Sequence, residues 1–122
     1  MMLIYETPED FAARTNERKE AQYGPWRLYY RALIEAGVYV GGAPLQPDST
    51  GTTVRVKNGQ RQVQDGPYAD TKEQLGGLII LELPTLDAAL DWAARCPTAA
   101  TGAIEVRPVA PEVRESVEHG SG

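Results

Sequence analysis

Four consecutive large apolar residues, Leu78 to Leu81, constrain the fold of this chain more than any other feature of its sequence. Successive residues of a strand point to opposite faces of a sheet, so a strand with this sequence is apolar on both faces. Such a strand is typical of the middle of a sheet that is covered on its two sides. We therefore expect residues 76–83 to form the central strand.

The beginning of the chain predicts a strand followed by a helix. Residues 2–6 are a short apolar run of the length of a buried strand, and we expect a first strand here rather than a signal peptide. Thr7 can cap a helix, Pro8 suits its first position, and Asp10 is placed as the acid of a capping box. Large apolar residues are rare over residues 11–22, so we expect a helix there with most of its circumference solvated.

Gly24-Pro25 is expected to interrupt this helix before a second one begins. Trp26, Tyr30 and Leu33 then repeat at helical spacing, and Gly37 is a natural stop for the second helix. We expect these aromatic side chains to pack in the core or in a dimer interface. A tyrosine hydroxyl at the edge of a pocket could still donate a hydrogen bond.

A β-hairpin is predicted around Asn58-Gly59. This dipeptide between two alternating segments is typical of a type I′ turn, in which both central residues have positive φ. The strands should cover residues 53–57 and 60–65. The alternation places Val54 and Val56 on one face and leaves the other face to solvent or to a function.

Three further elements complete the pattern. A strand is expected over residues 38–40, and Thr85 can cap a helix that Pro97 ends. Residues 104–109 alternate as a last strand. Because Pro108 cannot donate a hydrogen bond to a neighbouring strand, we place this strand at an edge of the sheet.

The order of these elements predicts an α+β protein with a ferredoxin-like, split βαβ fold and an inserted β-hairpin. In this fold the sheet is antiparallel and both helices cover the same face. The second face of the strand at Leu78 to Leu81 is then apolar and open, and face-to-face homodimerisation is the simplest way to cover it. We assign residues 1–109 to the domain and residues 110–122 to a polar C-terminal tail.

Composition argues against several classes of protein. Seventeen acidic against twelve basic residues give a net charge of -5, which disfavours nucleic-acid binding, and no stretch approaches the roughly 20 apolar residues of a membrane span. The single Cys96 cannot form an intramolecular disulfide, so we expect a cytoplasmic protein in which this residue is structural. His119 is the only histidine, so one chain has too few histidine side chains for a histidine-based metal site and almost none for a Ser-His-Asp triad. We expect no cofactor.

The connector over residues 65–77 concentrates ionisable side chains between a tight turn and the central strand. One interpretation is an ordinary turn followed by a solvated charged segment. The other is a pocket between the helix-free face of the sheet and a partner subunit, because connectors on a rigid sheet often carry binding groups. The candidate ligand-binding residues are Asp65, Lys72 and Glu73, with Arg55 or Tyr5 as further donors.

Several segments of this chain together resemble the YCII-related, DGPF-domain family. The segments are Leu3-Ile4-Tyr5, residues 41–47 (GGAPLQP), Thr53-Val54-Arg55 and, above all, residues 65–77 (DGPYADTKEQLGG). The likeness covers residues 2–109. It implies a dimeric α+β barrel, a bacterial origin and frequent association with extracytoplasmic-function sigma factors, and it implies no established activity.

Two departures from the family pattern limit what the resemblance implies. The phenylalanine of the DGPF motif is Tyr68 here, which adds a hydroxyl group. Better-studied relatives are thought to use a histidine on the first helical segment with an aspartate, whereas residues 23–26 read Tyr-Gly-Pro-Trp. Any proton chemistry would therefore rest on carboxylates, Lys72 or tyrosines, and the missing axial histidine also disfavours haem chemistry.

Two functions remain open at this point. The first is a homodimeric small-molecule-binding or weakly enzymatic module with a pocket near the connector. The second is a non-catalytic regulatory or interaction module that serves a sigma-factor system.

Overall fold

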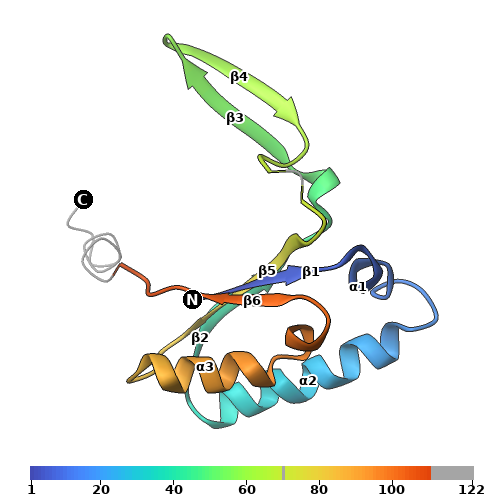
Figure 1. The fold of residues 1–122 in the computed structure, drawn as a ribbon, viewed down its shortest axis with the longest axis vertical. Coiled ribbons are helices and arrows are strands. Elements are labelled where there is room, and N and C mark those ends of the chain that lie inside the picture. Colours follow the sequence, from blue (N-terminus) through green and yellow to red (C-terminus); the bar gives the residue numbers. More distant parts are fainter. Residues whose placement is uncertain (70, 111–122) are drawn as a thin grey trace.

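The main sheet has four strands, and every neighbouring pair is antiparallel. The computed structural model describes residues 1–69 and 71–110 (Figure 1). The strands are β1 (Met2–Glu6), β2 (Tyr39–Pro44), β5 (Gln74–Leu81) and β6 (Ala103–Val106), and they lie in the order β2-β5-β1-β6. Two strands flank β5, as its apolar run predicts, and β6 lies at an edge. This order is compatible with a ferredoxin-like α+β fold.

Three α-helices accompany the sheet in the described part of the chain: α1 (Pro8–Ala12), α2 (Lys19–Glu35) and α3 (Leu86–Arg95). Figure 1 shows α2 and α3 side by side on one side of the sheet. The capping box is confirmed, because the amide of Asp10 donates to Thr7 Oγ1 (3.2 Å) and the amide of Thr7 donates to Asp10 Oδ2 (3.3 Å). The predicted start of the first helix and the predicted cap of the last helix, Thr85, are both correct.

The expected helix break at Gly24-Pro25 is wrong. The break lies instead between Ala12 and Lys19, and α2 continues through Pro25. A proline inside a helix removes the one hydrogen bond that its amide would donate to the carbonyl four residues earlier, here that of Ala21. Ala21 and Pro25 are both exposed, so water can satisfy that carbonyl. The predicted stop is correct, since Gly37 follows the helix with φ of 72°.

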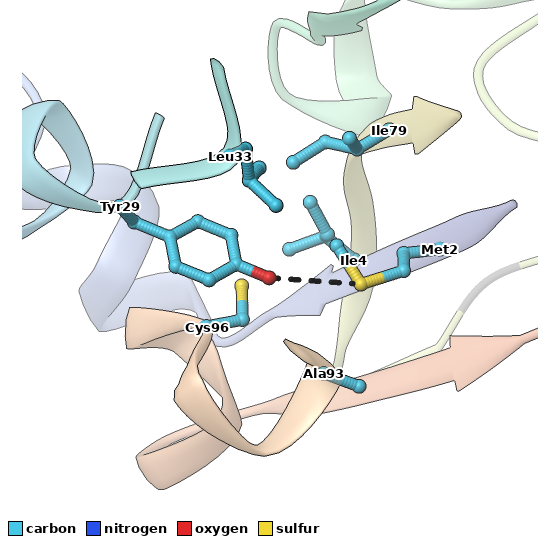
Figure 2. Packing of buried hydrophobic residues seen from close by; sticks show 7 residues of the cluster. All are labelled: Met2, Ile4, Tyr29, Leu33, Ile79, Ala93 and Cys96. Carbon is cyan, nitrogen blue, oxygen red and sulfur yellow. Dashed lines mark hydrogen bonds between the residues drawn. The ribbon is translucent and has the colours of Figure 1, made fainter. Parts of the chain in front are cut away.

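The core lies between the helices and the inner face of the sheet (Figure 2). Leu33 from α2 and Ile79 from β5 are fully buried, and Met2 and Ile4 of β1 lie beside them. The hydroxyl of Tyr29 donates to the carbonyl of Trp92 (2.7 Å), which ties α2 to α3 and satisfies a polar group in the core.

Cys96 belongs to this core and is 3% exposed. Burial raises the pKa of its thiol to about 11. Because the thiolate is the reactive form, a thiol in these surroundings is inert at neutral pH. This place in the core agrees with the structural role that the sequence predicts for Cys96.

The hairpin forms a second, two-stranded sheet from β3 (Thr52–Lys57) and β4 (Gln60–Asp65). Its turn is the predicted one, with φ of 52° at Asn58 and 75° at Gly59. The hairpin projects away from the main body, on the side of the sheet opposite to α2 and α3 (Figure 1).

Strand β2 is longer than the sequence suggests, because Gly41 to Pro44 continue the strand instead of ending it. The backbone of Gly42 lies so close to β5 that a side chain at position 42 would meet the carbonyl of Leu78. Two short 3₁₀ turns, η1 (Asp48–Thr50) and η2 (Pro97–Ala100), precede the hairpin and β6. Of the expected polar tail, residues 111–122 lie outside the described residues.

A candidate binding cleft between helix α2 and strand β2

A cleft of about 640 Å³ opens between α2 and the end of the sheet formed by β2 and β5. One wall consists of aromatic side chains from α2 and β2, namely Tyr23, Trp26, Tyr30 and Tyr39. The floor is the backbone of Gly76 and Gly77 together with the paired side chains of Glu6 and Arg14. The cleft is therefore largely apolar, with its charged groups gathered at one place.

The ion pair of Glu6 and Arg14 holds three segments of the chain together. Glu6 is the last residue of β1 and its side chain is 4% exposed. The Arg14 guanidinium donates to the Glu6 carboxylate, to the carbonyl of Leu45 and to the carbonyl of Gly76 (3.1 Å). It also lies 4.4 Å from the centre of the Phe11 ring. Arg14 thus joins the ends of β1 and β2 to the start of β5.

Gly76 and Gly77 provide the space that this ion pair needs. A Cβ atom at position 76 would overlap the carboxylate of Glu6. A Cβ atom at position 77 would lie 3.1 Å from the carbonyl oxygen of Ala43, which is tighter than most real contacts. The floor of the cleft leaves no room for a side chain at either position, which accounts for the two glycines at the end of the connector motif.

Glu6 has the properties of a group that can exchange a proton near the cleft. Burial raises the pKa of its carboxyl group above the ordinary 4.5, and the neighbouring Arg14 opposes this rise only in part. A carboxyl group with a raised pKa is closer to its own titration at neutral pH than an exposed glutamate. The floor of the cleft can therefore act as a hydrogen-bond acceptor or as a proton donor, depending on pH.

The aromatic wall is a continuous row of rings. The centres of the Trp26 and Tyr30 rings are 5.7 Å apart with a tilt of 37°, and those of Tyr30 and Tyr39 are 5.9 Å apart in an edge-to-face arrangement. Both distances are typical of favourable aromatic pairs. Burial also raises the pKa of Tyr30 above the ordinary 10.0, which further favours the protonated hydroxyl. Such a wall suits a flat, apolar part of a ligand.

The candidate residues of the connector do not gather in this cleft. Tyr5 and Glu73 line a shallow recess on the other side of the sheet, where the hydroxyl of Tyr5 donates to Glu105 (3.5 Å). Arg55 lies on the hairpin, with its guanidinium 4.8 Å from the centre of the Tyr68 ring. The two remaining candidates, Asp65 and Lys72, are exposed. A role in ligand binding stays a prediction for all five residues.

Sequence reasoning missed Glu6 and Arg14, although one signal was present. Met2, Ile4 and Glu6 are alternate residues of β1, so the acid lies on the same inward face as two core residues. An acid on a buried face needs a partner, because an unpaired buried charge is costly. This reasoning predicts a buried ion pair, but it does not identify Arg14 as the partner.

Across residues 1–69 and 71–110, no cluster of three or more His, Cys, Asp or Glu side chains is placed to hold a metal ion. None of the helices in this same part of the chain is long and apolar enough to cross a membrane.

Comparisons with known proteins extend over almost the whole chain. A model of the YCII-related domain matches residues 1–113. A similar protein is an uncharacterized protein of Rhizobium meliloti (strain 1021), which is 36% identical over 111 residues. The matched region covers 89% of this chain and 90% of that protein.

Proposed function

The chain belongs to the YCII-related domain family, and we propose that it is a small-molecule-binding protein whose site is the cleft between α2 and β2. The observation that carries this proposal is the ion pair of Glu6 and Arg14 at the floor of an aromatic-walled cleft. A concave, mainly apolar site with a few convergent polar groups is the usual form of a small-molecule site. The cleft also includes Gly76 and Gly77, the end of the connector motif.

The two polar side chains of the cleft favour a ligand with a hydroxyl group. Glu6, when ionised, accepts a hydrogen bond, whereas Arg14 can only donate. Among the contacts of the described residues, Arg14 uses three of its N–H groups, and a guanidinium has five. A hydroxyl can donate to Glu6 and accept from Arg14 at once. With the row of aromatic rings beside them, these groups suit a small hydroxylated aromatic molecule.

A titration of the ¹⁵N-labelled protein with phenol, followed by amide NMR, tests this proposal. Toluene is the matched probe, because it has the same ring without the hydroxyl. We expect phenol to shift the amide signals of Gly76 and Gly77 and to leave that of Gly59 on the hairpin unchanged. Toluene should shift the same signals but bind about tenfold more weakly, since it makes no polar contact with the floor.

Two variants assign the binding to the cleft or to the connector. Glu6→Gln should weaken phenol binding about tenfold, because an amide cannot replace the charged acceptor. Lys72→Ala is the control on the connector and should bind phenol like the wild type. The opposite result, with Lys72→Ala impaired and Glu6→Gln normal, would move the site to the connector and overturn the cleft.

We further propose that the protein is a homodimer in which the open face of the sheet is covered by a second copy. Leu3, Leu78 and Ala43 are paired across β1, β5 and β2, so they form one apolar row. Their inward neighbours Ile4 and Ile79 lie in the core, which places the row on the face without helices. A partly exposed apolar sheet face of this kind is typical of an interface, and a second copy on it would complete an α+β barrel.

Sedimentation velocity over a range of concentrations tests the dimer. A charged side chain in the middle of the open face should abolish it, so Leu78→Lys is expected to sediment as a monomer. Leu28→Lys is the matched control, because Leu28 is exposed on α2 on the other side of the sheet. A wild-type protein that is monomeric at all concentrations would refute the dimer without affecting the cleft. The association with a sigma factor stays a prediction that no described feature favours.

A further inference from the structure

The hairpin exposes a row of valines on one face. Val54 and Val63 face each other across β3 and β4, and Val56 lies two residues further along the same face. These side chains are 56%, 57% and 72% exposed. The other face carries polar residues, among them Arg55 and Gln62, which are paired. The valine face also carries Arg61, which is opposite Val56, and Asp65, which is opposite Thr52 at the base. The three valines still form its middle, and they are uncovered in a single chain.

An uncovered apolar face is unfavourable for an element of this size. A two-stranded hairpin alone in water is marginally stable at best, and it usually needs a third strand or a packing partner. At its base the hairpin is held by two hydrogen bonds, from the amide of Gly66 to Gly51 (2.8 Å) and from the hydroxyl of Thr53 to Gly66 (2.9 Å). Neither bond covers the valines. A partner outside the chain is therefore needed to bury them.

Charge distinguishes the hairpin from the rest of the chain. Its strands contain three basic residues, Arg55, Lys57 and Arg61, and one acid, Asp65. Outside these strands, residues 1–69 and 71–110 contain eight basic and twelve acidic residues. A basic arm is attracted to an acidic body, and a second copy of this chain offers such a body.

We propose that the hairpin is an arm that packs its valine face against the body of a second copy. This inference rests on the proposed homodimer. The hairpin projects on the side of the sheet that lacks helices (Figure 1), so a second copy on the open face would lie beside it. Each chain of the dimer then contributes one arm, and the contact is made twice by symmetry.

A triple variant on the valine face tests the arm. Val54→Thr, Val56→Thr and Val63→Thr keep the β-branched shape that favours strands but replace a methyl group with a hydroxyl. The matched control on the polar face is Gln62→Thr with Gln64→Thr. We expect the triple variant to raise the dissociation constant of the dimer about 100-fold, because both arms lose apolar contacts, and the control to change it less than about threefold.

The position of the arm is measured with a spin label in mixed dimers. Gln60→Cys places a reactive thiol at the end of the hairpin, while the buried Cys96 stays unreactive. Unlabelled protein with the nitroxide is mixed with ¹⁵N-labelled wild type, so that any broadening is intermolecular. We expect broadened signals on the body of the labelled copy.

The outcomes separate the arm from the dimer. Broadening together with a weakened triple variant supports the arm. A wild-type dimer that the triple variant forms equally well, without broadening, overturns the arm and leaves the dimer intact. If the hairpin signals instead shift with a DNA oligonucleotide while the triple variant dimerises normally, the occupant is a nucleic acid and the inference is wrong. A monomeric wild type overturns both proposals.

Discussion

The two parts of the connector have opposite surroundings. Residues 65–72 carry most of its charges, and the charged side chains described there, Asp65 and Lys72, are exposed. Residues 74–77 carry no charge, and Gly76 and Gly77 are buried against the ends of β1 and β2. A motif of thirteen residues thus begins in solvent and ends in the floor of a cleft.

In this connector, the residues that determine the packing are not the ones with reactive side chains. Gly76 has no side chain, yet its position decides whether Glu6 fits beside β5. Its carbonyl also accepts from Arg14 and from the amide of Leu45 (2.8 Å). In the first part of the connector, by contrast, we expect substitutions of the exposed charged side chains to have little effect on packing.

Gly76→Ala should have the largest effect, because it fills the buried part of the connector. A Cβ atom there overlaps the Glu6 carboxylate, so the ion pair or the strand must move. We expect the free energy of unfolding to fall by about 3 kcal/mol, measured by urea denaturation. The control is Gly24→Ala in α2, where nothing lies within 4 Å and the helix should gain about 0.5–1 kcal/mol. Equal effects of the two substitutions would contradict the close packing at Gly76.

Arg14→Met should have the next largest effect. It removes the partner of the Glu6 carboxylate and keeps much of the side-chain volume. We expect a loss of about 2 kcal/mol in urea denaturation at pH 7, because the buried carboxyl group of Glu6 is left without its charged partner. Adding Glu6→Gln to this variant should recover part of the loss. A double variant less stable than Arg14→Met alone would show that the charge of Glu6 is not the cause.

The pH dependence of stability should follow from Glu6. Its pKa is raised by burial, so the folded protein binds a proton at Glu6 more readily than the unfolded chain does. Glu6 therefore stabilises the fold most below its ordinary pKa of 4.5, and this contribution is lost as pH rises through the raised value. Relative to Glu6→Gln, the wild type should lose stability as pH increases above 4.5. A wild type that instead gains stability over Glu6→Gln as pH rises would mean that Arg14 affects the pKa of Glu6 more than burial does.

The smallest effects are expected in the exposed part of the connector. Asp65→Ala and Lys72→Ala should each change the free energy of unfolding by less than about 0.5 kcal/mol. Both side chains are exposed, so neither substitution opens a cavity. Thermal unfolding of each variant with and without phenol shows whether the replaced side chain contributes to binding or only to stability. A loss of more than about 2 kcal/mol in either variant would show that the two parts of the connector do not differ as described.

Local signals in the sequence predicted local structure well. Thr7 and Asp10 form the expected capping box, Asn58 and Gly59 form the expected turn, and the apolar run forms the central strand. Each of these depends on residues close together in the chain. One exception is Pro25, which the sequence suggests as a helix break, although a helix can lose one hydrogen bond where the carbonyl is exposed. Another is the run from Gly41 to Pro44, which continues β2 instead of ending it.

The cleft could not be predicted in the same way, because its contacts are distant in sequence. Arg14 meets Gly76, which lies 62 residues later, and no local pattern indicates this pairing. In the sequence, the charged residues of the connector are the conspicuous candidates for binding groups, whereas Glu6 only marks the end of a strand. Gly76 and Gly77 were part of the recognised motif, but their role follows only from the atoms that surround them.

The hydrogen bond between Gly66 and Gly51 at the base of the hairpin has a consequence for how this segment can vary among relatives. Because the arm begins and ends at one point, its length can change without moving the main sheet. Side chains alternate along a strand, so inserting one residue would turn Val54 and Val63 to opposite faces. Viable length changes should therefore add or remove two residues on each strand. Such a change keeps Val54 and Val63 on the same face of the hairpin.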